Sequence, residues 1–154
     1  MPTRQPSPNA QFLALLSQFP PEIVALVKRS VPKIRRAVPC SHQLVFEYPN
    51  SLVVSFGVSE RGYEAIVAIA IFPHWVRLYF DKSLPDPKGL LEGTGAKVRS
   101  VHLVAASDLD KADIRALFKA AIKRSGAAFP KTRSIRMVFK SVSKKRKPRK
   151  AKPA

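Results

Sequence analysis

Acidic residues are scarce in this 154-residue chain: ten aspartates and glutamates stand against 28 lysines and arginines, a formal net charge of +18. A surplus of this size favours anionic partners over cationic ones. Cysteine is almost absent as well, because Cys40 is the only one, which excludes an internal disulfide and fits a reducing cytoplasm. The longest apolar run covers residues 65–72, only eight residues, far below the roughly 20 that a bilayer span needs. We therefore expect a cytoplasmic protein with no membrane partner.

The composition of the whole chain is that of a globular protein, with 45% hydrophobic and 25% charged residues. Its length suits one domain with short extensions. Prolines at positions 2, 6 and 8 predict a disordered N-terminus over residues 1–9, followed by a domain over 10–126. Residues 127–143 are predicted to be an extension that docks as an edge strand. Residues 144–154 contain seven cations and no acid, so we expect a disordered tail.

Helical spacing of apolar residues appears at both flanks of the domain, and strand patterns fill the middle. A short helix is expected over residues 12–19, and a second begins at Pro21, where proline suits the first turn. Pro32 is expected to kink or split this second helix, with Ser30 as a cap for the second piece. Strands are expected near residues 44–46, 52–56, 65–72, 75–80 and 98–104, and a sixth strand or edge segment at 135–140.

The clearest predicted element is the last helix. Apolar residues from Ile114 to Ile122 recur at helical spacing, and Gly126 is a typical stop. Ser107 and Asp110 resemble a capping box, with Asp108 as a further cap. The pattern as a whole predicts an α+β fold: a single compact domain with a largely antiparallel sheet of about five or six strands. The N-terminal and C-terminal helices pack against this sheet.

Several short motifs of this chain resemble the YdhG-like domains, a bacterial family of unsettled molecular function. The resemblance covers residues 59–62, 75–80, 84–87 and 90–95, and extends to residues 139–146. It implies a compact α+β domain with a largely antiparallel sheet. Some members are described as frataxin-like iron chaperones, a role that calls for an exposed acidic ridge. The charge balance of this chain is the opposite, so we rank iron handling below anion binding.

Few residues suggest a reaction, and we expect the protein to lack enzymatic activity, a cofactor and a metal site. Cys40 and His42 lie two residues apart, too few ligands for a metal, and they are interpreted as structural. Asp108, Asp110 and Asp113 are better explained as helix-start residues than as a cation site. The glycine-rich segment 92–97 is interpreted as a tight turn, with an anion-contacting loop as the alternative. That loop would use Gly93, Gly95, Lys97 and Arg99, although its spacing is not that of a P-loop.

Basic side chains supply the strongest functional signal. One set recurs every four residues on the last helix, and a second lies on the helix that begins at Pro21. The first set comprises Lys111, Arg115, Lys119 and Lys123, and the second comprises Lys28, Arg29, Lys33, Arg35 and Arg36. The tail adds Lys144, Lys145, Arg146, Lys147, Arg149, Lys150 and Lys152.

These three basic sets predict a non-enzymatic binder of nucleic acid or another polyanion, with the tail as the main nucleic-acid-binding segment. A solubilising tail is the simpler explanation of that segment. The alternative function is a small-ligand or metal-handling module of the YdhG-like, iron chaperone-like kind. The sequence leaves the oligomeric state open.

Overall fold

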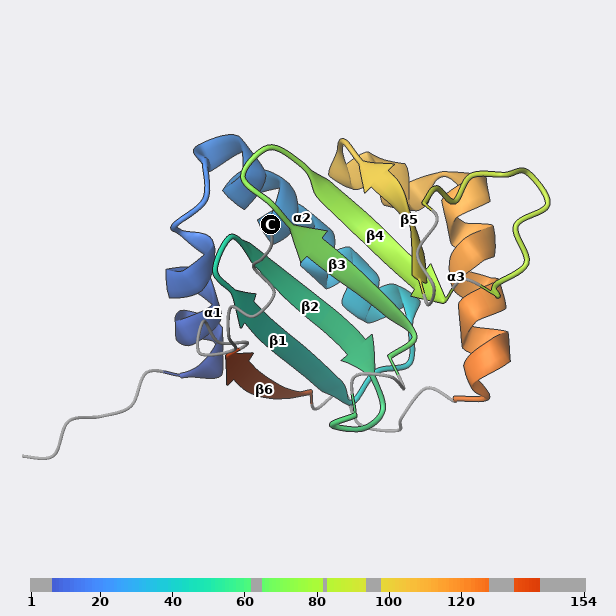
Figure 1. Ribbon diagram of the computed structural model, residues 1–154. Coiled ribbons are helices and arrows are strands. Elements are labelled where there is room, and N and C mark those ends of the chain that lie inside the picture. The colour runs from blue at the N-terminus through green and yellow to red at the C-terminus, as the bar shows by residue number, and fades with distance from the viewer. Residues whose placement is uncertain (1–6, 62–64, 82, 94–97, 128–134, 142–154) are drawn as a thin grey trace, which may run out of the picture.

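The computed structural model describes residues 7–61, 65–81, 83–93, 98–127 and 135–141. In these ranges the chain forms α1 (Pro8–Leu16), α2 (Pro21–Ala37), a 3₁₀ helix η2 (Ala106–Asp110) and α3 (Ala112–Ser125). The helices pack on one sheet as a single α+β domain (Figure 1), so the predicted fold class is confirmed. None of the described helices is both long and apolar enough to cross a bilayer.

The sheet has six strands in the order β5-β4-β3-β2-β1-β6. The strands are β1 (His42–Tyr48), β2 (Ser51–Gly57), β3 (Val67–Ile71), β4 (Val76–Asp81), β5 (Val98–Leu103) and β6 (Arg136–Ser141). Strands β1 to β5 pair antiparallel in sequence order, and β6 pairs parallel with β1 at the edge. The segment that the sequence left as a sixth strand or an edge segment is therefore both.

Helices α2 and α3 cover the same face of the sheet. Arg35 of α2 donates from Nε to Oε1 of Gln43 on β1 at 2.8 Å, and Phe118 of α3 packs against Phe80 of β4, with ring centroids 5.8 Å apart. Gln43 lies opposite Phe56 in the β1–β2 register, and both belong to the buried face that includes Phe80. Figure 1 shows α2 running behind the sheet, with α3 at the β4–β5 side. The two helices are thus neighbours over one core.

Helix α2 is continuous from Pro21 to Ala37, so the predicted split at Pro32 is wrong, and the kink stays a prediction. Proline has no N–H to bond the carbonyl of Lys28, but both residues lie on the exposed side, where water reaches that carbonyl. On the opposite side Val27, Val31 and Ile34 are buried in the core. Their burial holds the helix together across the missing hydrogen bond. Ser30 is fully buried inside the helix and does not cap a second piece.

The predicted capping box of Ser107 and Asp110 is also wrong, because residues 106–110 form η2 and α3 begins only at Ala112. Asp108 does not cap α3 either. Its Oδ2 accepts hydrogen bonds from the backbone N–H groups of Val104 and Ala105 at 2.9 and 3.0 Å, and its Oδ1 pairs with Lys111 at 3.1 Å. The carboxylate therefore fixes the turn that leads from β5 into η2.

The predicted end of α3 is confirmed. Gly126 follows the helix with φ of 72°, in the left-handed region, and its N–H bonds the carbonyls of Ile122 and Lys123. Glycine adopts this conformation without the steric cost that a side chain brings. Ile114, Leu117, Phe118 and Ala121 are the buried residues of this helix, and its remaining surface carries the basic stripe.

Replacing Asp108 with alanine is expected to lower the free energy of unfolding by about 0.5–2 kcal/mol at neutral pH, as for other lost caps. Burial alone would raise the pKa of Asp108, but the hydrogen bonds from Ala105 and Val104 and the charge of Lys111 lower it below its ordinary value. A lowered pKa means that the carboxylate stabilises the fold above its ordinary pKa, and that this contribution is lost as the pH falls through the folded-state pKa. Urea unfolding from pH 7 down to pH 3 should show the two proteins converge, and a pH-independent difference would contradict the assignment.

Candidate functional site

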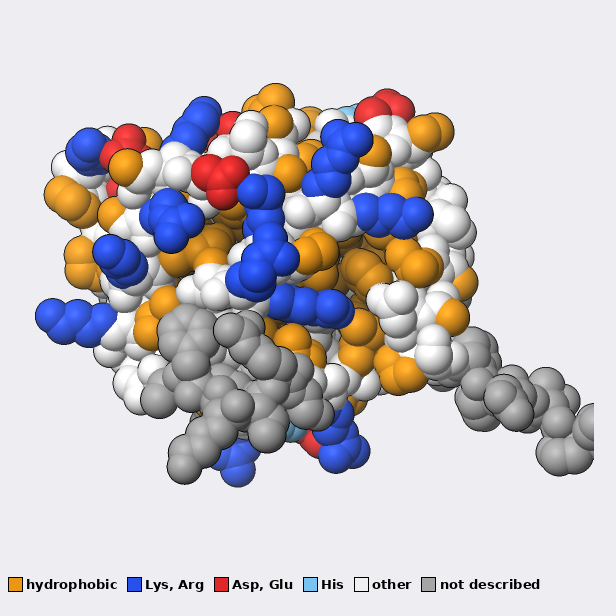
Figure 2. Space-filling model, turned by 180° about the vertical axis from the view of Figure 1, so that it is seen from behind, with side chains coloured by type: hydrophobic (Ala, Val, Ile, Leu, Met, Phe, Trp, Pro, Cys, Tyr) orange, Lys and Arg blue, Asp and Glu red, His pale blue; other side chains and the backbone are white. Residues whose placement is uncertain are grey.

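A groove separates the C-terminal half of α2 from α3 on the helical face of the molecule. Its cavity has a volume of about 510 Å³. The apolar part of its lining comes from Ala37 of α2, Leu109 of η2, and Phe118 and Ile122 of α3. Leu109 and Phe118 are almost fully buried, so the groove lies directly over the core. Figure 2 shows this face, where lysine and arginine side chains surround hollows with hydrophobic side chains at their base.

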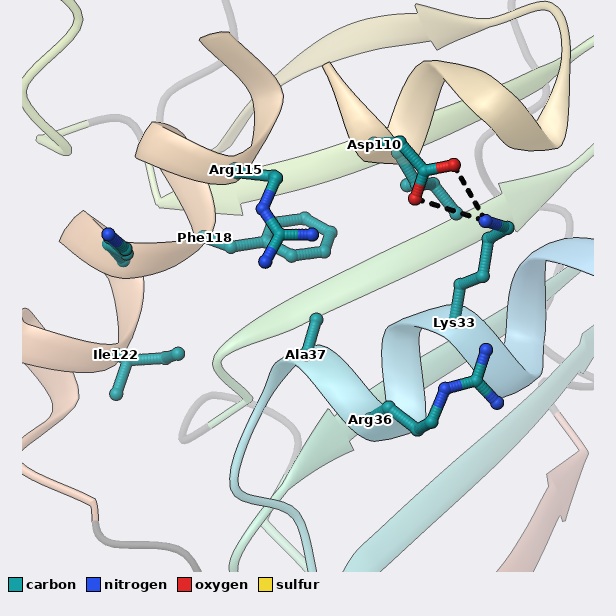
Figure 3. A pocket seen from close by; sticks show the side chains of 9 residues that line it. Lys33, Arg36, Ala37, Asp110, Arg115, Phe118 and Ile122 are labelled. Atoms are coloured by element: carbon teal, nitrogen blue, oxygen red, sulfur yellow. Dashed lines mark hydrogen bonds and ion pairs between the residues drawn. The ribbon is translucent and has the colours of Figure 1, made fainter. Parts of the chain in front are cut away.

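Four cations line the groove, two from each basic helix surface. Lys33 and Arg36 come from α2, and Arg115 and Lys119 come from α3. Asp110 is the one carboxylate among the lining residues. In Figure 3 the side chains of Lys33 and Ala37 approach the cavity from α2, and those of Arg115 and Ile122 from α3. The fold therefore brings together two basic surfaces that are more than 70 residues apart in the sequence.

One ion pair bridges the groove at its η2 end. The ammonium of Lys33 donates to both carboxylate oxygens of Asp110, at 3.0 Å to Oδ1 and 2.8 Å to Oδ2 (Figure 3). The two side chains are 31% and 56% exposed, so solvent screens the pair and it contributes little to stability. The pair matters for the geometry of the site, because one side chain from α2 and one from η2 are enough to span the groove at this end.

The other three cations of the groove are exposed and form no ion pair with the described residues: Arg36, Arg115 and Lys119. Neighbouring cations do have partners, because Lys111 pairs with Asp108 and the guanidinium of Arg35 bonds Gln43. Burial lowers the pKa of Arg35 from its ordinary value, and the nearby Cys40 offsets part of this. The groove therefore concentrates positive charge that the fold itself does not neutralise, which is the electrostatic condition for binding an anion.

The glycine-rich loop of the sequence analysis lies partly outside the described residues, which exclude Gly95 and Lys97. Gly93 has φ of 113°, a conformation that favours glycine, and Glu92 forms an isolated bridge with Ser100 of β5. The Arg77 guanidinium bonds both Glu92 and Ser100. Gly93 and Arg99 do not line the groove, and the tight turn predicted for 92–97 stays a prediction because most of this segment lies outside the described residues. The anion-contacting alternative stays a prediction.

The predicted nucleic-acid-binding tail, Lys144 to Lys152, lies wholly outside the described residues. The structure does show where the chain leaves the sheet. Strand β6 begins with Arg136 opposite His42 and ends with Ser141 opposite Glu47. The last residue of β6 therefore lies at the far end of β1, whereas α2 leads into the beginning of β1.

The residues considered for metal or catalytic chemistry are used elsewhere. Cys40 is buried in the core, and Nδ1 of His42 lies 2.9 Å from the hydroxyl of Ser41. The three aspartates do not converge, since Asp108 holds backbone N–H groups, Asp110 pairs with Lys33, and Asp113 pairs with Lys88 at 2.9 Å. No group of three or more potential metal ligands occurs in the part of the chain that the structure describes.

Sequence reasoning identified the cations of the groove but not the groove itself. Their four-residue spacing places Arg115 and Lys119 on one side of a helix. Nothing in that spacing indicates that Lys33 and Arg36 lie across the groove from them, because the placement of α2 relative to α3 depends on the strands that separate the two helices in the sequence.

Comparison with known proteins adds no assignment: no family model, curated protein or solved structure matches this chain.

Proposed function

We propose that this protein is a non-enzymatic binder of polyanions, with nucleic acid as the favoured partner. The groove between α2 and α3 provides the folded contact surface, and the basic tail provides a second one. The observation that carries the proposal is the convergence of two basic helix surfaces on one groove whose Arg36, Arg115 and Lys119 lack an ion-pair partner among the described residues.

A linear polyanion fits these two contact surfaces better than a compact anion does. Strand β1 has seven residues and spans roughly 20 Å at about 3.3 Å per residue. Strand β6, the last described element before the tail, ends beside the last residues of β1, and α2, which lines the groove, leads into its first residues. A chain of phosphates can contact both surfaces at once, and the second contact then gains from the high effective concentration that the first creates.

The alternative is a small anionic ligand in the same groove. Its volume of about 510 Å³ lies within the range of small-molecule sites, which combine an apolar lining with a few polar groups. Such a ligand would place its charge on the same cations. The tail would then have no part in binding, which separates this alternative from the favoured function.

Neutralising the groove is expected to weaken nucleic-acid binding. In the triple variant R36Q/R115Q/K119Q, the magnitude of the slope of log K against log salt should fall by about 2 on single-stranded DNA, because each phosphate contact contributes roughly 0.7. Fluorescence anisotropy with a labelled oligothymidylate of about 15 nucleotides, at several salt concentrations, measures this slope.

The matched control is K28Q/R29Q/K123Q, which removes the same three charges from exposed positions on the same two helices. None of these residues lines the groove. We expect the control to keep most of the slope. Equal losses in the two variants would assign binding to net charge rather than to the groove, and absence of binding by the unmodified protein at low salt would refute the proposed function.

A further inference from the structure

We propose that the groove holds a single strand of nucleic acid and does not accept a duplex. This inference rests on the proposed function and names the form of nucleic acid that the site selects. Three features of the groove support it: the span of its bridged end, its apolar floor and the position of its unpaired cations.

The span of the groove comes first. At the η2 end, the side chains of Lys33 on α2 and Asp110 on η2 together span the groove and meet at 2.8–3.0 Å. A duplex presents its phosphates on a convex surface, with its bases turned inward and paired. Such a surface touches the rims of a narrow groove and cannot enter it. One sugar-phosphate chain, with its bases unpaired, has no such obstacle.

The floor is the second feature. Ala37, Leu109, Phe118 and Ile122 present apolar surface below the ring of cations. Phosphates gain nothing from such a surface, but an unpaired base or a sugar does, since apolar area is removed from water on contact. In a duplex the bases are already stacked and paired, and only their edges are accessible. An apolar floor beneath a cationic rim therefore complements an unpaired nucleotide.

The cations are the third feature. Arg36 on one bank, and Arg115 and Lys119 on the other, are exposed and lack ion-pair partners among the described residues. Lys33 is the fourth cation and is held by Asp110. An entering phosphate must compete with that carboxylate. Asp110 is thus a negative group at the bridged end of the site, and removing its charge releases Lys33 for a further phosphate contact.

The test compares the loss caused by R36Q/R115Q/K119Q on two probes, using the full-length protein. The probes are an oligothymidylate of about 15 nucleotides and a duplex of the same length. Since the tail contributes to the binding of both probes, the difference between the affinity lost for the single strand and that lost for the duplex reports the contribution of the groove. We expect at least a tenfold loss of affinity for the single strand and less than a threefold loss for the duplex. Equal losses would overturn the inference and leave the proposed function standing.

A second variant keeps the inference testable if the triple variant is unstable. D110N removes the negative charge with little change in shape, and should raise affinity for the single strand by about fivefold while leaving duplex affinity unchanged. Unchanged affinity for the single strand would overturn the inference. Thymidine monophosphate serves as a competitor, added so that its phosphate concentration equals that of the oligonucleotide. If the monophosphate displaces the oligonucleotide under these conditions, the inference is overturned in favour of a free nucleotide as the ligand. If neither probe binds the unmodified protein at low salt, the proposed function itself fails.

Discussion

Replacing Phe118 with alanine is expected to lower the free energy of unfolding by about 3–5 kcal/mol, the usual cost of deleting a buried aromatic side chain. Phe118 is 3% exposed and packs against Phe80 with ring centroids 5.8 Å apart. Its removal leaves a cavity at the contact between α3 and β4, and the floor of the groove loses its aromatic ring. Equilibrium unfolding in urea, followed by circular dichroism, measures the change.

The control for this variant is Lys119→Ala, the next residue on the same helix. Lys119 is exposed, so its truncation should change stability by no more than about 0.5 kcal/mol. If Phe118→Ala unfolds at the same urea concentration as the unmodified protein, α3 does not pack on the sheet as described. The groove would then lose its second bank, and the proposed function would lose its main support.

The fold was predictable where local pattern and tertiary packing agree. The apolar spacing from Ile114 to Ile122 identified α3, and Gly126 marked its end because the left-handed conformation there favours glycine. Short apolar runs bounded by turn residues identified the central strands, and alternation of apolar residues identified β4. The antiparallel pairing of β1 with β2, and of β3 with β4, follows from the short connections between these consecutive strands.

The errors arose where contacts outside a local motif override the signal of that motif. Pro32 breaks helices in isolation, yet the burial of Val27, Val31 and Ile34 keeps α2 continuous through it. Ser107 has the spacing of a capping residue, but Asp108 bonds backward to Val104 and Ala105 and converts the segment into η2. In both cases the deciding contact involves residues that the local motif does not contain.

The candidate site was only half predictable, for a related reason. The basic spacing on each helix is a local property, so the sequence indicated Lys33, Arg36, Arg115 and Lys119 as surface cations. Their convergence depends on five strands that lie between α2 and α3 in the chain. The ion pair of Lys33 with Asp110, two residues 77 positions apart, is likewise a product of tertiary structure. The interpretation of the aspartates as helix-start residues did not indicate that Asp110 would pair with Lys33.

The second large effect concerns the basic tail, which carries seven of the 28 lysines and arginines. Each duplex phosphate that a cation neutralises releases condensed counterions, and contributes about −0.9 to the slope of log K against log salt. If most of the tail cations contact phosphate, the tail should contribute a slope of roughly −4 to −6 on duplex DNA. Deleting residues 144–154 should therefore abolish most of the salt dependence measured by fluorescence anisotropy with a duplex probe.

The deletion should leave the domain folded, because β6 ends at Ser141 and its pairing with β1 is kept. A cut before β6 would remove that strand and expose the edge of β1, so the boundary matters. The control keeps the tail length and replaces its seven lysines and arginines with glutamine. Since phosphate contacts carry little sequence information, both variants should lose affinity equally for duplexes of different sequence. If the deleted and full-length proteins bind duplex DNA with the same slope, the tail only solubilises the chain, and duplex binding must depend on cations of the folded domain.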